Sequence, residues 1–453
     1  MREESFIYRD FTSWVAVDNA IMQKMKVSRE PVKGTADWFP AEMKRRRYIF
    51  QVWREVCRAF NYQEYLTPFL EYAQLYRAKS GLDVGGVELT VFRDRGGREL
   101  ALRPEMTPGV TRLVTRRYRS WPKPIRLFSI ANFFRNEKPQ RGRNREFWQL
   151  NYDLFGSSSY AADLEVCQIA LEIMLAFNPP SGSFVLYFNH RQLLNVFLRQ
   201  LKIKEEKAQR EVLRFLDKWN KISPEERKRE MRRLGLGELE QEKIIQWMQC
   251  PDLSTWLRQF PSLSRDKNYI LLSALERDLT ALGYGNWIKF QPSLIRGFDY
   301  YDGLIFEVFD LSPQNQRSLF GGGRYNALAE IFGHPPIPAV GAAPGDEPTY
   351  LFLESWNLWP QEKEGERLVY LPWLGGEFLT ILKVARFLRQ QGWRVETGLK
   401  KETLSAALRQ GAKKGFPFVA ICGEREIERR IVILRNLEKG REEELAVPVL
   451  GQS

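Results

Sequence analysis

The segment over residues 125–156 constrains the fold of this chain more than any other, because a basic stretch separates two apolar ones. The apolar stretches read IRLFSIANFF (125–134) and FWQLNYDLFG (147–156). Pro139 and Gly142 between them exclude one continuous helix. The pattern predicts two β-strands joined by a long, basic, flexible loop. Besides Arg126, the arginines of this segment are Arg135 on the first strand and Arg141, Arg143 and Arg145 on the loop.

The composition is that of a basic globular chain long enough for two or three domains. Its 453 residues are 43% hydrophobic and 13% aromatic, which supports packed cores and excludes wholesale disorder. Lys and Arg number 69 against 56 Asp and Glu, so the formal net charge is +13. A basic protein of this size often binds nucleic acid or another polyphosphate, because phosphate contacts release counterions. Solubility alone is the other reading of this charge.

The cysteines, the histidines and the hydrophobic pattern exclude several classes of protein. The four cysteines form no CxxC pair and only two histidines exist, so we expect neither a zinc site nor a disulfide framework. The opening residues, MREESFIYRDFTSWVAVDNA, do not have the basic and apolar regions of a signal peptide. No apolar run approaches the roughly 20 residues of a membrane span. We therefore expect a cytoplasmic protein with no membrane partner.

The chain divides into a large and a small predicted domain. Residues 1–30 form a leader, and residues 31–359 would form an α+β domain of antiparallel sheet and helices. Within it, residues 201–268 are charged and poor in β-branched residues, which predicts a helical insertion. A charged linker at 360–367 precedes alternating strands and helices over 368–453. That alternation predicts a compact α/β domain with a largely parallel sheet.

Local patterns predict individual elements of the large domain. Residues 42–60 place apolar side chains at helical spacing, and ELTVFRDRGGRELALRP predicts a hairpin that turns at Gly96-Gly97. Further helices are expected from near Pro108 and over residues 161–177.

Arginines recur on or beside four strand-like segments of the large domain. They are Arg103 in LRPEMTP, Arg135, Arg296 in LIRGFDYYDG and Arg324 in FGGGRYNAL. A charge in such a place is costly unless it is paired. Each arginine could form a structural salt bridge with Glu105, Glu137, Asp153 or Asp299. All four together, with Gly297 and Gly321–Gly323 permitting close backbone approach, favour a phosphate site.

The chemistry that suits this set is phosphoryl or nucleotidyl transfer. The P-loop pattern GxxxxGK[ST] is absent, and FGGGRY does not have the GxGxxG spacing. Two histidines, one of them in the loop GHPPIP, give little support to a Ser-His-Asp or Cys-His arrangement. Arginines and carboxylates without a nucleophile fit a reaction whose catalysis consists of positioning and charge neutralisation.

These segments, in this order, resemble the signatures of class II aminoacyl-tRNA synthetases, and specifically of histidyl-tRNA synthetases. Residues 42–60 with YQEYLTPFLE resemble motif 1, whose proline, here Pro68, lies at a dimer interface in the family. FRNEKPQRGRNREFWQLNYDLFG resembles motif 2 in its histidyl form. RGFDYY and GGRY resemble the two peptides that mark histidyl enzymes, and residues 368–453 resemble an anticodon-binding domain.

The resemblance implies a homodimeric histidine–tRNA ligase that binds L-histidine, tRNA(His) and ATP with Mg²⁺ as substrates. It implies no tightly bound cofactor and no DNA partner, and it assigns no metal ligands. The ATP-binding residues would be Arg135, Glu137 and Arg296, of which Arg135 and Arg296 are the catalytic cations at the α-phosphate. The histidine pocket would consist of Glu105, Thr107, Gln149, Asp153, Tyr301 and Tyr325. Gln140 and Arg141, on the loop tip, would face the acceptor end of the tRNA.

Three positions depart from the family pattern. The family usually has glutamate at Asp153, and Asn136 stands where a histidine is common. Motif 3 is expected to read G-x-E-R, whereas this chain reads GDEP and places Pro348 at the arginine. That arginine normally stacks on adenine and touches the γ-phosphate, so either another cation substitutes for it or ATP binding is weakened.

Two other functions are open alternatives. A non-catalytic relative could keep the fold and histidine binding as a regulatory or sensing protein. The regulatory subunit of ATP phosphoribosyltransferase is such a relative, but it has no C-terminal anticodon-binding domain. A tRNA-binding module without a small-molecule pocket would not need LRPEMT or RGFDYY. The motifs therefore favour the ligase.

Overall fold

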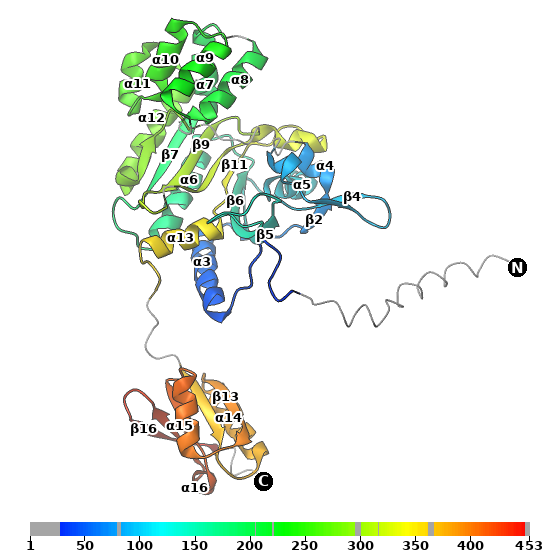
Figure 1. Cartoon of the computed structure of the whole chain (residues 1–453), viewed down its shortest axis with the longest axis vertical. Helices are drawn as coiled ribbons and strands as arrows, with labels where there is room; N and C mark the ends of the chain where they lie inside the picture. Colours follow the sequence, from blue (N-terminus) through cyan, green and yellow to red (C-terminus); the bar gives the residue numbers. More distant parts are fainter. Residues whose placement is uncertain are drawn as a thin grey trace, which may run out of the picture. The chain divides into compact units, whose positions relative to one another are not determined.

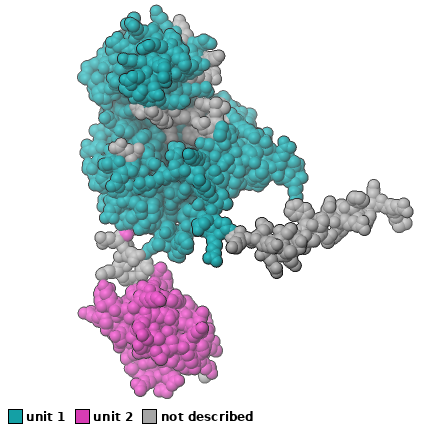
Figure 2. Space-filling model, in the orientation of Figure 1, with its two compact units in different colours: residues 1–359 teal, residues 360–453 magenta. Residues whose placement is uncertain are grey.

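The chain folds into two compact units, which Figure 1 traces and Figure 2 colours separately. In this computed structural model, unit 1 spans Met1–Trp359 and unit 2 spans Pro360–Ser453. The structure describes residues 28–78, 83–203, 205–219, 222–294, 300–315, 317–360 and 367–448. Most of the predicted leader, together with Arg296, Gly297 and Asp299, lies outside the described residues.

Unit 1 is built on an eight-stranded, mostly antiparallel sheet. In spatial order its strands are β1 (Gln63–Glu64), β5 (Ile125–Phe134), β6 (Glu146–Phe155), β11 (Ala339–Ala342), β10 (Ser318–Arg324), β9 (Leu304–Asp310), β7 (Phe184–His190) and β8 (Ile288–Phe290). The outermost pairs, β1 with β5 and β7 with β8, are parallel, and the inner pairs are antiparallel. The predicted α+β class is confirmed.

The basic segment forms the predicted strand, loop and strand. β5 and β6 pair without interruption from Ile125 opposite Phe155 to Phe134 opposite Glu146. Side chains alternate between the faces of β5, so Leu127 packs on one face and Phe128 on the other. Both faces are covered, which explains why these strands read as nearly continuous apolar runs.

The helices of unit 1 cover both faces of this sheet. The described helices are α3 (Pro40–Ala59), α4 (Ala73–Arg77), α5 (Thr107–Arg117), α6 (Tyr160–Leu175), α7 (Arg191–Gln200), α8 (Glu206–Asp217), α9 (Pro224–Arg233), α10 (Glu238–Met248), α11 (Leu253–Gln259), α12 (Lys267–Leu279) and α13 (Asp346–Ser355). Short 3₁₀ or π turns are η1 (Asp83–Val87), η3 (Pro261–Arg265), η4 (Thr280–Tyr284), η5 (Gly285–Trp287) and η6 (Asn326–Phe332). Three predicted helices correspond to α3, α5 and α6.

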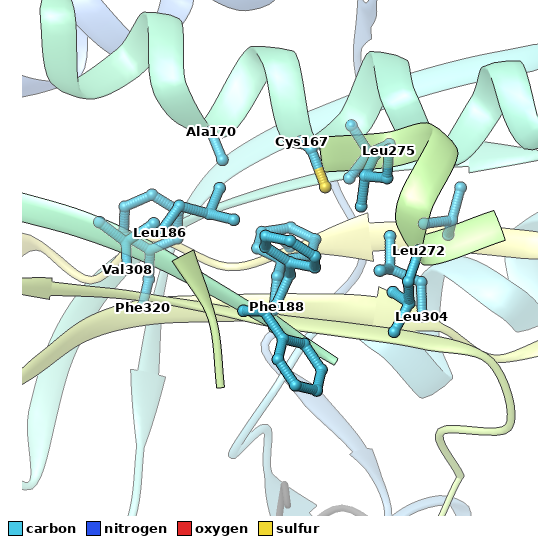
Figure 3. Close-up of a cluster of buried hydrophobic side chains, with 14 of the residues drawn as sticks. Cys167, Ala170, Leu186, Phe188, Leu272, Leu275, Leu304, Val308 and Phe320 are labelled. Atoms are coloured by element: carbon cyan, nitrogen blue, oxygen red, sulfur yellow. The ribbon is translucent and has the colours of Figure 1, made fainter. Parts of the chain in front are cut away.

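The main core lies between one sheet face and the helices α3, α6 and α12. Figure 3 shows part of it, where Cys167 of α6 and Leu272 of α12 lie near Phe188 of β7 and Leu304 of β9. The opposite face is covered by α5, whose Val110 belongs to the second core cluster. This second cluster borders the candidate site described below.

A small three-stranded sheet lies beside α5. Its spatial order is β2 (Leu70–Tyr72), β4 (Glu99–Leu102) and β3 (Val91–Arg93), and all pairs are antiparallel. The predicted hairpin turn is present, because the Gly97 amide donates to the Asp94 carbonyl at 2.9 Å with a φ of 75° at Gly97. Glycine suits this left-handed conformation.

The helical region expected at residues 201–268 contains α8, α9, α10 and α11, drawn in green in Figure 1. It is anchored to the sheet-bearing part by α7, which follows β7 directly. Trp247 of α10 stacks on Phe197 of α7 with ring centroids 3.8 Å apart. No helix in the described ranges is both long enough and apolar enough to cross a bilayer.

Unit 2 is an α/β domain with a five-stranded sheet. In spatial order its strands are β13 (Arg394–Lys401), β12 (Leu368–Trp373), β14 (Phe418–Ile421), β15 (Ile431–Asn436) and β16 (Glu442–Ala446). Its helices are α14 (Phe378–Gln390), α15 (Leu404–Lys413) and α16 (Glu424–Arg429).

The sheet of unit 2 is less parallel than the sequence pattern predicts. β12 is parallel to β13 and β14, but β15 and β16 join antiparallel. The chain between β14 and β15 spans only residues 422–430. A crossover to a parallel neighbour needs a dozen or more residues, so this short connection forces the antiparallel direction.

Candidate active site

A cavity of about 360 Å³ in unit 1 brings most of the predicted site residues together. Its lining includes Glu105, Thr107, Arg135, Glu137, Gln149, Asp153, Tyr301 and Tyr325. These residues come from segments far apart in the sequence, namely the start of α5, the chain after β5, the interior of β6, and the regions before β9 and after β10. Gln149 and Asp153 face the cavity, whereas Leu150 and Tyr152 between them point into the main core.

Three of the predicted site residues are not among the described residues that line this cavity. Gln140 and Arg141 lie at the tip of the β5–β6 loop, where the amide of Gln140 bonds to the carbonyl of Arg143 at 3.1 Å. Arg296 lies outside the described residues, so the structure does not test its role.

Asp153 is a deeply buried carboxylate of the cavity. Its side chain belongs to a residue only 3% exposed, and the Tyr325 hydroxyl donates a hydrogen bond to Oδ1. Oδ2 is buried and has no hydrogen-bond partner among the described residues. Burial outweighs the bond from Tyr325 and raises the pKa of the Asp153 carboxyl to about 7. A buried acceptor open to a cavity suits an N–H or O–H group of a ligand.

Polar groups surround the ligand space next to Asp153. The Tyr300 hydroxyl donates to Oε2 of Glu105 at 3.1 Å, and Glu105 is itself buried. Nε2 of Gln149 donates to the Ala343 carbonyl at 3.2 Å, which fixes the amide plane. A carboxylate and an amide held in this way can bind the ammonium and carboxylate groups of an amino acid.

A glycine of β10 makes room for one aromatic wall of the cavity. A Cβ built on Gly323 would lie 2.8 Å from Cδ1 of Tyr301, so only glycine lets this ring approach the strand. The glycine run was predicted to permit close backbone approach, and here the group that approaches is an aromatic ring.

Arg135 supplies a cation in the part of the cavity that is lined by the residues after β5. Its Nε donates to the Pro104 carbonyl at 3.0 Å, and its guanidinium lies 5.0 Å from the centroid of the Phe147 ring. No carboxylate within the described ranges forms an ion pair with it. Glu137 lies nearby and is 3.7 Å from Nη1 of the exposed Arg143. The charge of Arg135 therefore remains available to an anionic ligand.

The predicted phosphate site of four arginines is wrong for Arg103 and Arg324. Arg103 is 3% exposed and donates to the carbonyls of Thr67 and Asn132, each at 2.8 Å. Arg324 forms a buried ion pair with Asp163 of α6, with Nε and Oδ1 2.8 Å apart. Both guanidinium groups are satisfied by the protein, so they hold the fold together instead of binding a ligand.

Arg46 is a structural cation that the sequence analysis did not identify. It comes from α3 and donates to Oδ2 of Asp346 at 2.7 Å and to Oε1 of Glu347 at 2.6 Å. Asp346 also accepts from the Trp148 amide at 2.9 Å, so it ties α13 to β6. Helical spacing could have indicated that Arg46 is buried, because it lies three residues before Ile49 and therefore on the same face of the helix.

The cavity wall contains further polar residues to which the sequence assigned no role. They include Glu88, Asn151 and Glu307, together with Asp346 and Glu347 of the GDEP segment. Burial raises the pKa of the Asp346 carboxyl to about 7 although Arg46 opposes the shift. Pro348, which replaces the expected arginine of motif 3, also lines the cavity from the first turn of α13. Proline is tolerated there because first-turn amides have no helical partner.

Comparison with known families gives two consecutive matches. The family described as histidyl-tRNA synthetase matches residues 34–345, and the anticodon binding domain matches residues 377–450. The first match alone covers more than half of the chain.

Full-length relatives and solved structures agree with these matches. A histidine–tRNA ligase of Leptospira biflexa is 38% identical over 418 residues, which cover 92% of this chain and 95% of that protein. The histidine–tRNA ligase of Pyrococcus horikoshii is 36% identical over 91% of this chain and 95% of its own length. The crystal structure of histidyl-tRNA synthetase from Nostoc sp. shares the fold, with a TM-score of 0.77 at 22% identity over 94% of this chain and 98% of that one.

Proposed function

The chain belongs to the histidyl-tRNA synthetase family and is a histidine–tRNA ligase, and on this premise we propose how its residues divide the reaction. ATP activates L-histidine to histidyl-adenylate, and the histidyl group is then transferred to tRNA(His). The observation that supports the division of roles is that one cavity contains eight of the residues predicted to bind histidine and ATP, all of them except Arg296.

Asp153 recognises the imidazole of histidine in this proposal. Its Oδ2 is a buried acceptor without a partner in the described part of the chain, and Tyr325 holds Oδ1. An imidazole N–H can donate to Oδ2, and Tyr301 contacts the ring's other nitrogen. Glu105, Thr107 and Gln149 bind the ammonium and carboxylate groups at the other end of the amino acid. A competitor without the imidazole N–H leaves a buried acceptor unpaired, which gives strong discrimination.

Arg135 and Arg296 stabilise the charge that develops on the α-phosphate of ATP. The histidine carboxylate attacks the α-phosphorus and forms a mixed anhydride, while the bond to pyrophosphate breaks and its electrons leave with pyrophosphate. Two guanidinium groups would lower the energy of this transition state, since each can donate two hydrogen bonds to phosphate oxygens. Glu137 contacts the adenine side. The role of Arg296 rests on the resemblance of RGFDYY alone.

Mg²⁺ is proposed to enter bound to ATP. Carboxylate oxygens suit this hard cation, and Glu307 of the cavity wall can supply one. Among the described residues, no group of three or more His, Cys, Asp or Glu side chains could hold a metal ion by itself. Phosphate oxygens and water would therefore supply most ligands, and the ion would neutralise phosphate charge when bound.

The tRNA is proposed to contact both units. Gln140 and Arg141, at the tip of the β5–β6 loop, would meet its acceptor end. Unit 2 would bind the anticodon region, which is supported by the anticodon-binding match over residues 377–450. Its exposed basic residues near β13 and α15 include Lys400, Lys401, Arg409, Lys413 and Lys414. The same match speaks against a non-catalytic regulatory protein, which would not need this domain.

We further propose a homodimer that works in the cytoplasm, where charged tRNA is used. Exposed apolar side chains near Pro68 support an interface, because large apolar patches on a surface mark contact sites. They are Leu66, Leu70, Tyr72 and Phe92, which are 66%, 43%, 48% and 42% exposed. A stable monomer by light scattering at micromolar concentration would contradict the dimer.

The test of the proposed function is ATP–pyrophosphate exchange with each standard amino acid. Histidine alone should stimulate the exchange. Stimulation by another amino acid, with none by histidine, would contradict the roles given to Asp153 and its neighbours.

A further inference from the structure

Arg317, the residue before β10, is a partly exposed cation whose chain neighbour Ser318 lines the cavity. Its Nη1 donates to the carbonyl of Arg141 at the tip of the β5–β6 loop. No carboxylate in the described part of the chain forms an ion pair with it. A guanidinium whose observed partner is a neutral carbonyl keeps its full charge for a stronger acceptor.

The guanidinium of Arg317 lies against Gly142 and close to α13. A Cβ built on Gly142 would lie 2.5 Å from Nη1 of Arg317 and 2.9 Å from Cδ1 of Leu351. Gly142 and Pro348 both line the cavity, and Leu351 follows Pro348 by three residues on α13, which places both on one side of the helix. The guanidinium therefore lies between the loop tip and the helix where the chain has proline instead of arginine.

The described part of the cavity wall carries fewer cations than carboxylates. Among the described residues its charged side chains are Arg135 and Arg143 against Glu88, Glu105, Glu137, Asp153, Glu307, Asp346 and Glu347. Arg46 pairs with two of these carboxylates, Asp346 and Glu347. Because it donates its hydrogen bonds to them, it does not offer these donors to a ligand. The outer phosphates of ATP would add negative charge to a wall that is already acidic, so cations at its rim decide whether they bind.

We propose that Arg317 binds the β- or γ-phosphate of ATP and compensates for Pro348. The proposal rests on the function proposed above. On ATP entry, the guanidinium exchanges the Arg141 carbonyl for phosphate oxygens, which accept charge-assisted and bidentate hydrogen bonds. Gly142 leaves space for this movement because it has no side chain to block the guanidinium. Release of the carbonyl also frees the loop tip that carries Gln140 and Arg141.

The proposal is tested by equilibrium binding of two ligands to the full-length protein. Calorimetry would compare ATP with Mg²⁺ against a non-hydrolysable analogue of histidyl-adenylate, which has no β- or γ-phosphate. Arg317→Ala should weaken ATP binding about tenfold or more and leave binding of the analogue within about twofold of the unchanged protein. Arg317→Lys should restore part of the ATP affinity, because it keeps the charge but not the fork. Arg386→Ala, which removes an exposed arginine from α14 of unit 2, is the control for net charge.

Each other outcome overturns the proposal. Unchanged ATP affinity in Arg317→Ala would show that the outer phosphates bind elsewhere. Equal weakening of both ligands would show that Arg317 only positions the loop. Failure of the proposed function is distinguishable, since in that case the unchanged protein itself would show neither ATP binding nor histidine-dependent pyrophosphate exchange.

Discussion

Gly341 of β11 lies directly opposite Asp153 of β6, and the Asp153 carboxylate occupies the space where a side chain at position 341 would be. A Cβ built there would overlap Oδ1 of Asp153 and would lie 2.6 Å from the Tyr152 carbonyl oxygen. The carboxylate can therefore lie close to the neighbouring strand, where the Tyr325 hydroxyl reaches it. This glycine sets the position of the acceptor proposed to recognise histidine.

Gly341→Ala should therefore impair histidine recognition. The new methyl group displaces the Asp153 carboxylate and presses on the Tyr152 carbonyl of the same strand. We therefore expect the KM for histidine in pyrophosphate exchange to rise tenfold or more, while the KM for ATP changes much less. Gly96→Ala in the β3–β4 turn is a matched control, since a Cβ there meets its nearest neighbour at 3.4 Å. Equal KM values for histidine in the two variants would contradict the positioning role of Gly341.

The raised pKa of Asp153 predicts how stability depends on pH. Burial raises it to about 7, whereas an unfolded aspartate titrates near 4, so between these values the folded state holds a proton that the unfolded state has lost. Stability attributable to this group therefore falls as pH rises from about 4 through 7. Asp153→Asn removes the effect, so the variant should gain roughly 2–3 kcal/mol relative to the unchanged protein between pH 5 and pH 8.

The measurement is chemical denaturation of both proteins at several pH values. Asp346 titrates in the same range but is present in both proteins, so its contribution cancels in the difference. A constant difference between the two proteins across this range would mean that Asp153 is ionised throughout.

Neighbouring arginines on α3 should differ sharply in their effect on stability. Arg46→Met leaves Asp346 and Glu347 without their buried cation and should lower the unfolding free energy by about 3 kcal/mol or more. Arg45 pairs with Glu354 at the surface, with side chains 46% and 45% exposed, and Arg45→Met should cost less than about 1 kcal/mol. Urea unfolding of both variants measures the difference. Similar losses would show that the Arg46 cluster does not anchor α13.

Two arginines that look alike in sequence should separate into a catalytic and a structural one. Arg135→Ala should slow pyrophosphate exchange roughly a hundredfold, because the activation free energy rises by about 3 kcal/mol. The stability of the fold should change little. Arg324→Ala leaves the buried Asp163 carboxylate without its ion-pair partner and should destabilise the fold by about 3 kcal/mol. Exchange kinetics and urea unfolding on both variants test this. A destabilised Arg135→Ala with normal exchange would reverse the assignment.

Removal of unit 2 should separate the two steps of the reaction. The cavity belongs wholly to unit 1, so a protein that ends at Trp359 should keep histidine-dependent pyrophosphate exchange. Aminoacylation should fall by at least tenfold, because the proposed anticodon contacts are lost. Circular dichroism would first establish that the shortened chain is folded. Unchanged aminoacylation would require another role for unit 2.

The sequence alone determined the local elements and the family of this protein. The strands β5 and β6, the helix α3 and the turn at Gly97 follow from periodicity and from the placement of Pro and Gly, which are properties of neighbouring residues. Eight of the predicted site residues also line one cavity, because the resemblance carried information on residues far apart in the chain. The antiparallel β15 was missed although the short connection before it was visible.

Only the tertiary structure decided which charges are free and which are paired. Arg135 and Arg324 both follow apolar strand sequence, but α6 brings Asp163 to Arg324 across 161 residues, and no carboxylate within the described ranges pairs with Arg135. Likewise, Gly341 matters because β11 pairs with β6 in the register that sets it against Asp153. A local sequence pattern shows that a charged side chain will be buried at a cost, but it does not show which residue will pair with that charge. The pairing residue comes near only when distant segments pack together.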